Sequence, residues 1–259
     1  MAQPGRPVLW HIKVSHYNEK ARWALDHKEI EHDRRAPIPG SHMLFALWLT
    51  RGRGKTFPVL ELDGERIGDS TRIIEALERR YPDPPLYPAD PEERARALAL
   101  EDFFDEEFAP YVRRLVWHEA VKDPEGFAEW AAQQVPAPLN RRTAPAGAFA
   151  SMFVKLRYGA ASDEAAEIAR AKIVTGLDRL DAELGTGDYL VGDRFTVADL
   201  TAASLMYPLV RPPEGPRVEF DPPEPLQRFF DSLSGRRGYE WTAEMFRRHR
   251  RRAPAPAPA

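Results

Sequence analysis

The stretch from Lys55 to Leu77, KTFPVLELDGERIGDSTRIIEAL, decides the fold. Two short segments that fit strands, Phe57–Leu62 and Glu65–Ile67, flank the pair Asp63-Gly64, which readily adopts the positive φ angles of a tight hairpin turn. From Ser70 to Tyr81 the apolar residues recur at helical spacing. The stretch therefore predicts two short strands joined by a hairpin turn and followed by a helix.

The residues before this stretch predict a strand, a helix and a second strand. Apolar and polar residues alternate from Pro7 to Val14, the pattern of a strand with one buried face. A short polar turn separates this run from Glu19–His27, which is rich in helix formers. Ile30–Arg34 fits a second strand, and the apolar run Met43–Leu49 fits a short helix inside the connecting segment 36–55. This half of the chain thus follows the order βαβ, then ββα.

The residues after the stretch predict a linker and a helical half. Four prolines within Tyr81–Pro88 cannot continue a helix, because proline lacks the N–H donor and fixes φ. The segment Asp90–Glu93 then fits a helix start, with an N-cap and a proline at the first helical position. Pro110 predicts a kink in this helix. Residues 123–161 are poorly patterned and predict a loop with some helix, whereas Glu164–Leu184 predicts a long helix.

The composition excludes several classes of function. The 259 residues carry a formal net charge of −3, which argues against general affinity for nucleic acid. No run approaches the roughly 18 apolar residues that a membrane helix needs, so we expect a cytoplasmic protein without a membrane partner. Because the chain has no cysteine, disulfides, cysteine zinc sites and cysteine nucleophiles are excluded. No metal-ligand spacing is present either, and we expect no metal.

Four local patterns carry a resemblance to a known family. They are Val14–Arg22 at the first strand–helix turn, Lys55–Leu60 around a proline, Gly68–Thr71 at a helix start, and Gly192–Leu200. In the last pattern, the threonine at 196 and the aspartate at 199 fit a capping box. Together with the βαβ–ββα order and the proline linker, these patterns make the chain resemble the glutathione S-transferase superfamily.

The resemblance implies two domains. The expected fold class is α+β, with a thioredoxin-like N-terminal domain that contains a βαβ-ββα mixed sheet, followed by an all-α helical bundle. The expected boundaries are residues 1–84 for the thiol-binding domain, 85–90 for the linker and 91–246 for the helical domain. Residues 247–259, rich in arginine, alanine and proline, predict a disordered tail.

The first pattern places Ser15 where the family carries its thiol-activating residue. A thiol with a pKa of about 8.5 must ionise, and helix-terminal amides together with a hydroxyl donor stabilise the thiolate. Tyr17 and Asn18 are alternative donors, because His16 stands where the family usually has proline. Capping of the helix by Ser15 is the other interpretation of this residue. His16 itself is expected on the surface of the turn.

The second and third patterns imply a site for glutathione or a related low-molecular-weight thiol. By resemblance, the Phe57–Pro58 bond is cis, and the backbone of Phe57 bonds the cysteinyl part of the tripeptide. Ser70 and the helix N-terminus suit the γ-glutamyl carboxylate, while Asp69 pairs with the α-amino group. Lys55 is expected to reach the glycyl carboxylate, and a solvated lysine is the equal alternative.

The resemblance also implies a site for a second, electrophilic substrate in a cleft between the domains. The residues expected near it are Met43, Phe45, Trp48, Phe104, Phe108 and Tyr111, with core packing as the alternative for most of them. The implied function is a detoxifying transferase that joins the thiol to an apolar electrophile and acts as a homodimer. The alternatives are a glutathione-dependent isomerase, peroxidase or lyase, and a non-catalytic binding module. Thiol exchange through a mixed disulfide needs a protein cysteine and is excluded.

Overall fold

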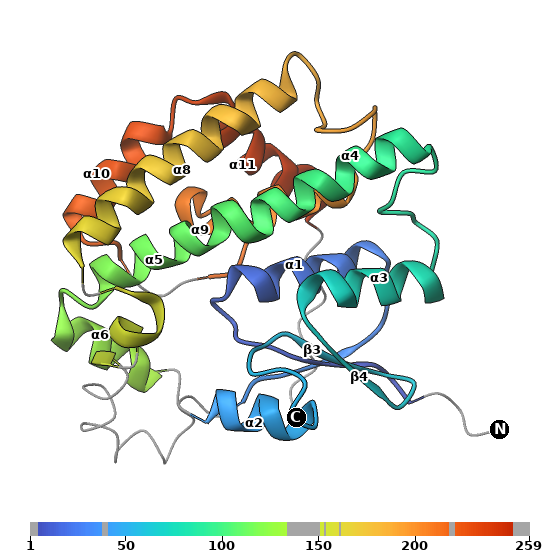
Figure 1. The fold of residues 1–259 in the computed structure, drawn as a ribbon, viewed down its shortest axis with the longest axis horizontal. Helices are drawn as coiled ribbons and strands as arrows, with labels where there is room; N and C mark the ends of the chain where they lie inside the picture. Colours follow the sequence, from blue (N-terminus) through green and yellow to red (C-terminus); the bar gives the residue numbers. More distant parts are fainter. Residues whose placement is uncertain are drawn as a thin grey trace.

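The structure is a computed structural model, and it describes residues 5–37, 41–133, 151–152, 154–160, 162–217 and 221–250. Within these ranges, a mixed sheet and three helices occupy the chain up to residue 80, and helices follow from residue 91 onward (Figure 1). The predicted fold class, a thioredoxin-like domain followed by a helical domain, is confirmed. No helix of the described ranges has the length and apolar character needed to cross a membrane.

The sheet has four short strands in the order β2-β1-β3-β4. β1 (Val8–Trp10) runs parallel to β2 (Asp33–Arg35) and antiparallel to β3 (Val59–Leu62), which pairs antiparallel with β4 (Glu65–Gly68). Asp63 and Gly64 join β3 to β4 with φ angles of 48° and 82°, the backbone that an Asp-Gly pair favours. β1 is shorter than predicted because the chain turns after it, and the Ser15 N–H donates to the Ile12 carbonyl (3.2 Å).

Helices cover both faces of this sheet. α1 (His16–His27) and α3 (Ser70–Arg80) lie between the sheet and the helical domain, and α2 (His42–Leu49) lies on the opposite side (Figure 1). Leu9 and Leu60 of the sheet are fully buried in one core with residues of α1 and α3. α1 begins three residues earlier than the sequence predicts, which puts Ser15 at its N-cap.

The helical domain packs around one almost completely buried helix, α9. Its elements are α4 (Pro91–Asp102), η1 (Phe103–Phe108), α5 (Ala109–Ala120), α6 (Pro124–Gln133), α8 (Asp163–Leu184), α9 (Val197–Val210), α10 (Glu224–Leu233) and α11 (Arg237–His249). The predicted capping box of α9 is confirmed, because the Thr196 N–H donates to Asp199 Oδ2 (2.8 Å) and Thr196 Oγ1 accepts from the helix amides. Asp199 Oδ1 also accepts from the Leu190 N–H (2.8 Å), which fixes the preceding loop.

The helix type changes next to Pro110, where the sequence predicts a kink. The six residues of η1, immediately before it, form π-helical turns, and a new α-helix then begins with Pro110 in its first turn. A proline in the first turn costs no hydrogen bond, since its missing N–H would have no partner there. The proline is therefore accommodated by a change of helix type just before it.

A buried cluster of charges joins the two domains. Lys20 of α1 has no exposed side-chain surface, and its ammonium lies 2.7 Å from Glu101 Oε1 and 2.8 Å from Asp105 Oδ2. Lys20 also donates to Thr71 Oγ1 (2.9 Å), on the first turn of α3. On the other side of α1, the Tyr207 hydroxyl of α9 donates to the Val14 carbonyl (2.5 Å). The strand–helix turn that carries Ser15 is therefore held by the helical domain.

The arginine-rich tail begins later than predicted. α11 continues to His249, and Arg250 is buried, with its Nε 2.6 Å from Glu19 and a terminal nitrogen 2.6 Å from Asp26. The prediction of disorder is therefore wrong for residues 247–250, because Arg250 neutralises two carboxylates of α1. Residues 251–259 lie outside the described part of the chain.

Candidate active site

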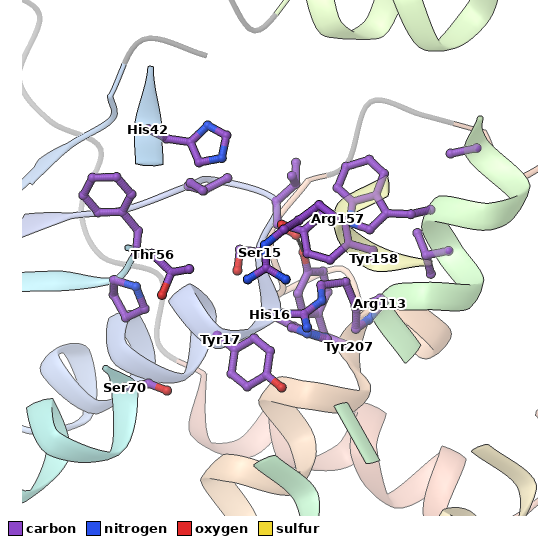
Figure 2. A pocket seen from close by; sticks show the side chains of 18 of the residues that line it. Ser15, His16, Tyr17, His42, Thr56, Ser70, Arg113, Arg157, Tyr158 and Tyr207 are labelled. Carbon is purple, nitrogen blue, oxygen red and sulfur yellow. Dashed lines mark hydrogen bonds between the residues drawn. The ribbon is translucent and has the colours of Figure 1, made fainter. Parts of the chain in front are cut away.

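A cavity of about 390 Å³ lies between the two domains (Figure 2). Seven predicted site residues line it from the N-terminal domain: Ser15, Tyr17, Met43, Phe57, Pro58, Asp69 and Ser70. The helical domain contributes mainly aromatic and cationic side chains: Arg113, Trp117, Phe127, Trp130, Arg157 and Tyr158. Among the described residues, no group of three or more His, Asp or Glu side chains is arranged to hold a metal ion. The cavity thus brings the predicted thiol site against an aromatic wall.

Ser15 stands at the N-cap of α1 but does not cap the helix. Its backbone is extended, with φ −83° and ψ 128°, and its side chain accepts no hydrogen bond from the helix amides. Instead, Asn18 Nδ2 donates to Ser15 Oγ (2.7 Å). A hydroxyl that accepts from an amide keeps its own proton for another acceptor. The interpretation of Ser15 as a helix cap is therefore wrong, and its O–H can be donated into the cavity.

The two alternative donors are already engaged. Asn18 is fully buried, its Nδ2 also donates to the Phe57 carbonyl (3.1 Å), and its Oδ1 accepts from the Ile12 N–H (3.0 Å). The Tyr17 hydroxyl donates to the Asp105 carbonyl (2.8 Å), and burial raises the pKa of Tyr17 above its ordinary value. Asn18 therefore orients Ser15 and the Phe57 segment, and neither side chain offers a spare proton to a thiolate.

The segment around Phe57 presents backbone groups to the cavity. The Phe57–Pro58 peptide bond is cis. Within the described chain, the Phe57 carbonyl accepts only from Asn18, and the Phe57 N–H has no hydrogen-bond partner. A carbonyl has two lone pairs, so this one can accept a second bond. The backbone on both sides of Phe57 can therefore pair with an extended peptide.

Asp69, the N-cap of α3, has an uncommon backbone conformation. Its φ is 78°, a value that few residues other than glycine adopt, and such positions concentrate at ligand sites. Asp69 Oδ1 accepts from the Thr71 N–H (2.9 Å) and the Arg72 N–H (3.3 Å), while Ser70 beside it is buried. The Asp69 carboxylate therefore caps α3 and faces the cavity at the same time.

Most of the residues expected around the second substrate lie elsewhere. Met43 lines the cavity, but the other five and Lys55 do not. Phe104 and Phe108 are buried in the main core. The Phe45 ring packs against the Trp10 ring, with 4.8 Å between their centroids, and Trp48 is 66% exposed. The Tyr111 ring makes cation–π contacts with Arg114 and Lys172. Lys55 is an exposed lysine. Core packing, the alternative interpretation, is thus correct for Phe104 and Phe108, because helical spacing does not separate core from cavity.

Among the cavity-lining residues that the sequence analysis missed are His16 and Arg113. His16 is 4% exposed rather than on the surface, and its burial beside the Arg113 guanidinium lowers its pKa to about 3, so the ring is neutral at neutral pH. Arg113 shares one face of α5 with Val116, Trp117 and Ala120, all of which line the cavity. Their spacing of three and four residues was the signal in the sequence, an apolar helix face interrupted by one arginine.

Both halves of the chain match models of known domains. The model of the glutathione S-transferase N-terminal domain matches residues 9–85, and that of the glutathione S-transferase C-terminal domain matches residues 159–232. The first match contains the Ser15, Phe57–Pro58 and Asp69–Ser70 side of the cavity. The second contains the capping box of α9.

Individual relatives agree with these matches. The chain is 28% identical over 204 residues to a probable maleylacetoacetate isomerase of Caenorhabditis elegans, covering 78% of each chain. It is 29% identical over 163 residues to protein LigF of a Sphingobium strain, covering 60% of each chain. The crystal structure of LigF, a β-etherase, matches with a TM-score of 0.61 at 20% identity over 92% of this chain and 99% of that chain.

A solved structure also matches almost end to end. It is a glutathione S-transferase from Methylobacterium radiotolerans in complex with glutathione sulfonate, with a TM-score of 0.55 at 25% identity over 98% of this chain and 99% of that chain. The order of elements, the two domain matches and these relatives lead to one conclusion. The chain belongs to the glutathione S-transferase superfamily.

Proposed function

We propose that this protein is a glutathione-dependent isomerase or lyase in which the Ser15 hydroxyl stabilises the glutathione thiolate. The observation that carries the proposal is the hydrogen bond from Asn18 Nδ2 to Ser15 Oγ (2.7 Å), which leaves the Ser15 proton to be donated into the cavity. Relatives named as a probable maleylacetoacetate isomerase and as a β-etherase favour isomerisation or bond cleavage over simple conjugation.

The chemistry begins with ionisation of the bound thiol. The thiol proton leaves to solvent, and the sulfur anion accepts the Ser15 O–H; a hydrogen bond to the charged form lowers the pKa of the thiol. The thiolate then forms a bond to an electrophilic carbon of the second substrate. In a lyase, an oxygen leaving group departs with the electron pair and takes up a proton. In an isomerase, the thiolate adds reversibly and is released unchanged.

The tripeptide is held by the N-terminal domain in this proposal. The Phe57 N–H and carbonyl pair with the cysteinyl backbone, as a strand edge pairs with an added strand. The N-terminus of α3 and the Ser70 hydroxyl receive the γ-glutamyl carboxylate, and the Asp69 carboxylate receives the α-amino group. These contacts put the cysteinyl sulfur near Ser15, where proximity accelerates its attack.

The test is the pKa of the bound thiol in Ser15→Ala, with Ser162→Ala as the matched control. Ser162 is also a helix N-cap, but it does cap α8, accepting from the Ala165 N–H (3.1 Å). A hydrogen bond to a charged group contributes about 1.5–3 kcal/mol, so we expect Ser15→Ala to raise the thiol pKa by about 1–2 units. Ser162→Ala should cost about 1 kcal/mol of stability and leave the thiol pKa unchanged.

The measurement is the ultraviolet absorbance of the glutathione thiolate bound to each protein, followed against pH, together with calorimetry for affinity. An unchanged thiol pKa in Ser15→Ala would remove the role of Ser15. Absence of any affinity for glutathione in the wild type would refute the whole proposal. Affinity without turnover of unsaturated or ether substrates would favour a non-catalytic binding module.

A further inference from the structure

The helical-domain side of the cavity contains two arginines for which the described residues offer no counterion. Three arginines line the cavity, Arg113, Arg157 and Arg211. Within the described residues, Arg113 and Arg157 form no ion pair and donate no hydrogen bond, and Arg113 Nε is buried without a partner. Arg157 is exposed, whereas Arg113 is half-buried, and a half-buried guanidinium with unused N–H groups loses hydration without compensation. The unused donors of Arg113 therefore make it suited to bind an anionic ligand.

Two aromatic rings fix the position of the Arg113 guanidinium. Its central carbon lies 5.4 Å from the ring centroid of Tyr17 and 4.8 Å from that of Tyr158. Both contacts are of the cation–π type, which occupies the faces of a guanidinium and leaves the N–H groups at its edge for hydrogen bonds. Because Tyr17 belongs to α1 and Tyr158 to the helical domain, the guanidinium is held where the two domains meet.

His16 adds a second unused polar group at the same place. The Leu205 backbone lies near the His16 ring, but neither ring nitrogen makes a hydrogen bond with good geometry in the described chain, and the residue is 4% exposed and lines the cavity. A neutral imidazole has one N–H to donate. His16, Arg113 and Arg157 line the same cavity as Ser15 and Tyr158 (Figure 2). These polar groups therefore share the cavity with the hydroxyl proposed to hold the thiolate.

The surrounding wall is aromatic. The Trp117 ring lies 6.0 Å from the Phe127 ring, 5.7 Å from the Trp130 ring and 6.5 Å from the Tyr158 ring, measured between centroids. Rings of this kind pack against flat apolar ligands. Of the acidic residues that line the cavity, Glu106 is exposed on η1 and Asp69 caps α3. No carboxylate lies within ion-pair distance of Arg113 in the described chain.

We propose that the second substrate is an aromatic molecule carrying a carboxylate, with its ring against the Trp117–Tyr158 wall and its carboxylate on Arg113. The planar guanidinium matches a carboxylate in a two-bonded pair, and His16 and Arg157 donate to its remaining lone pairs. The inference deepens the proposed function and rests on it for the reaction, but not for binding. It replaces the purely apolar electrophile expected from the sequence.

The experiment compares the binding of two unreactive probes, 2-naphthoate and its neutral counterpart 2-naphthamide. Calorimetry is done on the wild type with and without S-methylglutathione, which fills the thiol side but cannot react. We expect naphthoate to bind at least about tenfold more tightly than naphthamide, the effect of one charge-assisted hydrogen bond. In Arg113→Gln the ratio of the two affinities should fall toward one, and Arg113→Lys should keep part of it.

Arg72→Gln is the matched control, because Arg72 is an exposed arginine that does not line the cavity. It removes the same charge and should leave the naphthoate preference unchanged. Equal affinities of the wild type for the two probes would overturn the inference. Loss of glutathione affinity in Arg113→Gln, with the naphthoate preference intact, would also overturn it, since Arg113 would then serve the tripeptide. Naphthoate preference without any glutathione affinity would refute only the proposed function.

Discussion

Replacing Lys20 with methionine is expected to lower the free energy of unfolding by about 3–5 kcal/mol. The Lys20 ammonium is fully buried, 2.7 Å from Glu101 and 2.8 Å from Asp105, and the Glu101 side chain is only 1% exposed. Methionine fills a similar volume but leaves these carboxylates without their cation. Removing one partner of a buried ion pair costs this much because the remaining charge has neither water nor a counterion.

The same change should make stability depend on pH in a defined direction. Burial raises the pKa of Glu101, and the Lys20 ammonium is the main opposing cause, so its removal raises the pKa of Glu101 further. The folded state then binds a proton that the unfolded state, with a carboxyl pKa of about 4.3, has already released. The stability of the variant therefore falls as the pH rises from about 4.3 toward the raised pKa of Glu101. Its deficit in unfolding free energy relative to the wild type should be larger at about pH 8 than at about pH 5.

Urea unfolding, followed by tryptophan fluorescence at both pH values, measures this effect. Lys122→Met is the control, because Lys122 is a half-exposed lysine 3.4 Å from Glu119 and should cost at most about 1 kcal/mol. The reasoning is refuted by equal losses in the two variants, or by a Lys20→Met deficit that grows as the pH is lowered. Either result would mean that the interdomain cluster does not carry the charge assigned to it.

Two further substitutions test the packing of the helical domain and its contact with α1. Gly176→Ala would put a Cβ 2.2 Å from a ring carbon of Phe108 and should cost about 1–3 kcal/mol in thermal unfolding. The control Gly235→Ala, whose added Cβ would meet nothing within 4 Å, should have little effect. Equal losses in the two variants would contradict the close approach of Gly176 to Phe108. Arg250→Met leaves Glu19 buried with one cation fewer and should cost about 3 kcal/mol in urea unfolding, while a loss within about 0.5 kcal/mol would mean that Arg250 is solvated.

Local interactions explain which elements the sequence predicted well. The hairpin at Asp63-Gly64 and the capping box of Thr196 and Asp199 are each formed by residues within a few positions of one another. The cap of α4 is equally local, since Asp90 accepts from the amides of the two residues after Pro91. Such contacts depend on residue type and spacing alone, so the sequence contains them in full.

The site was predictable only in part, because its residues act through partners that are distant in sequence. Ser15 was found, but its hydroxyl is oriented by Asn18, whose amide also bonds the carbonyl of Phe57, 39 positions away. Phe108 was expected in the cavity and is in the core, whereas Arg113, five positions further on, is in the cavity. The π-helical turns of η1 lie just before Arg113, and no pattern in the sequence predicted them.

The sequence by itself determined the two-domain order, the helix and hairpin starts, and the candidate residues Ser15, Phe57, Asp69 and Ser70. The element order and the helix and hairpin starts follow from backbone propensities and from capping and turn chemistry, which operate over a few residues, whereas the candidate residues come from the family resemblance. The tertiary structure alone decided that Ser15 Oγ accepts from Asn18 and that Arg113 stands in the cavity with no counterion among the described residues. Burial, charge pairing and the remaining hydrogen-bond capacity of a side chain are properties of its neighbours in space, and chain order does not specify those neighbours.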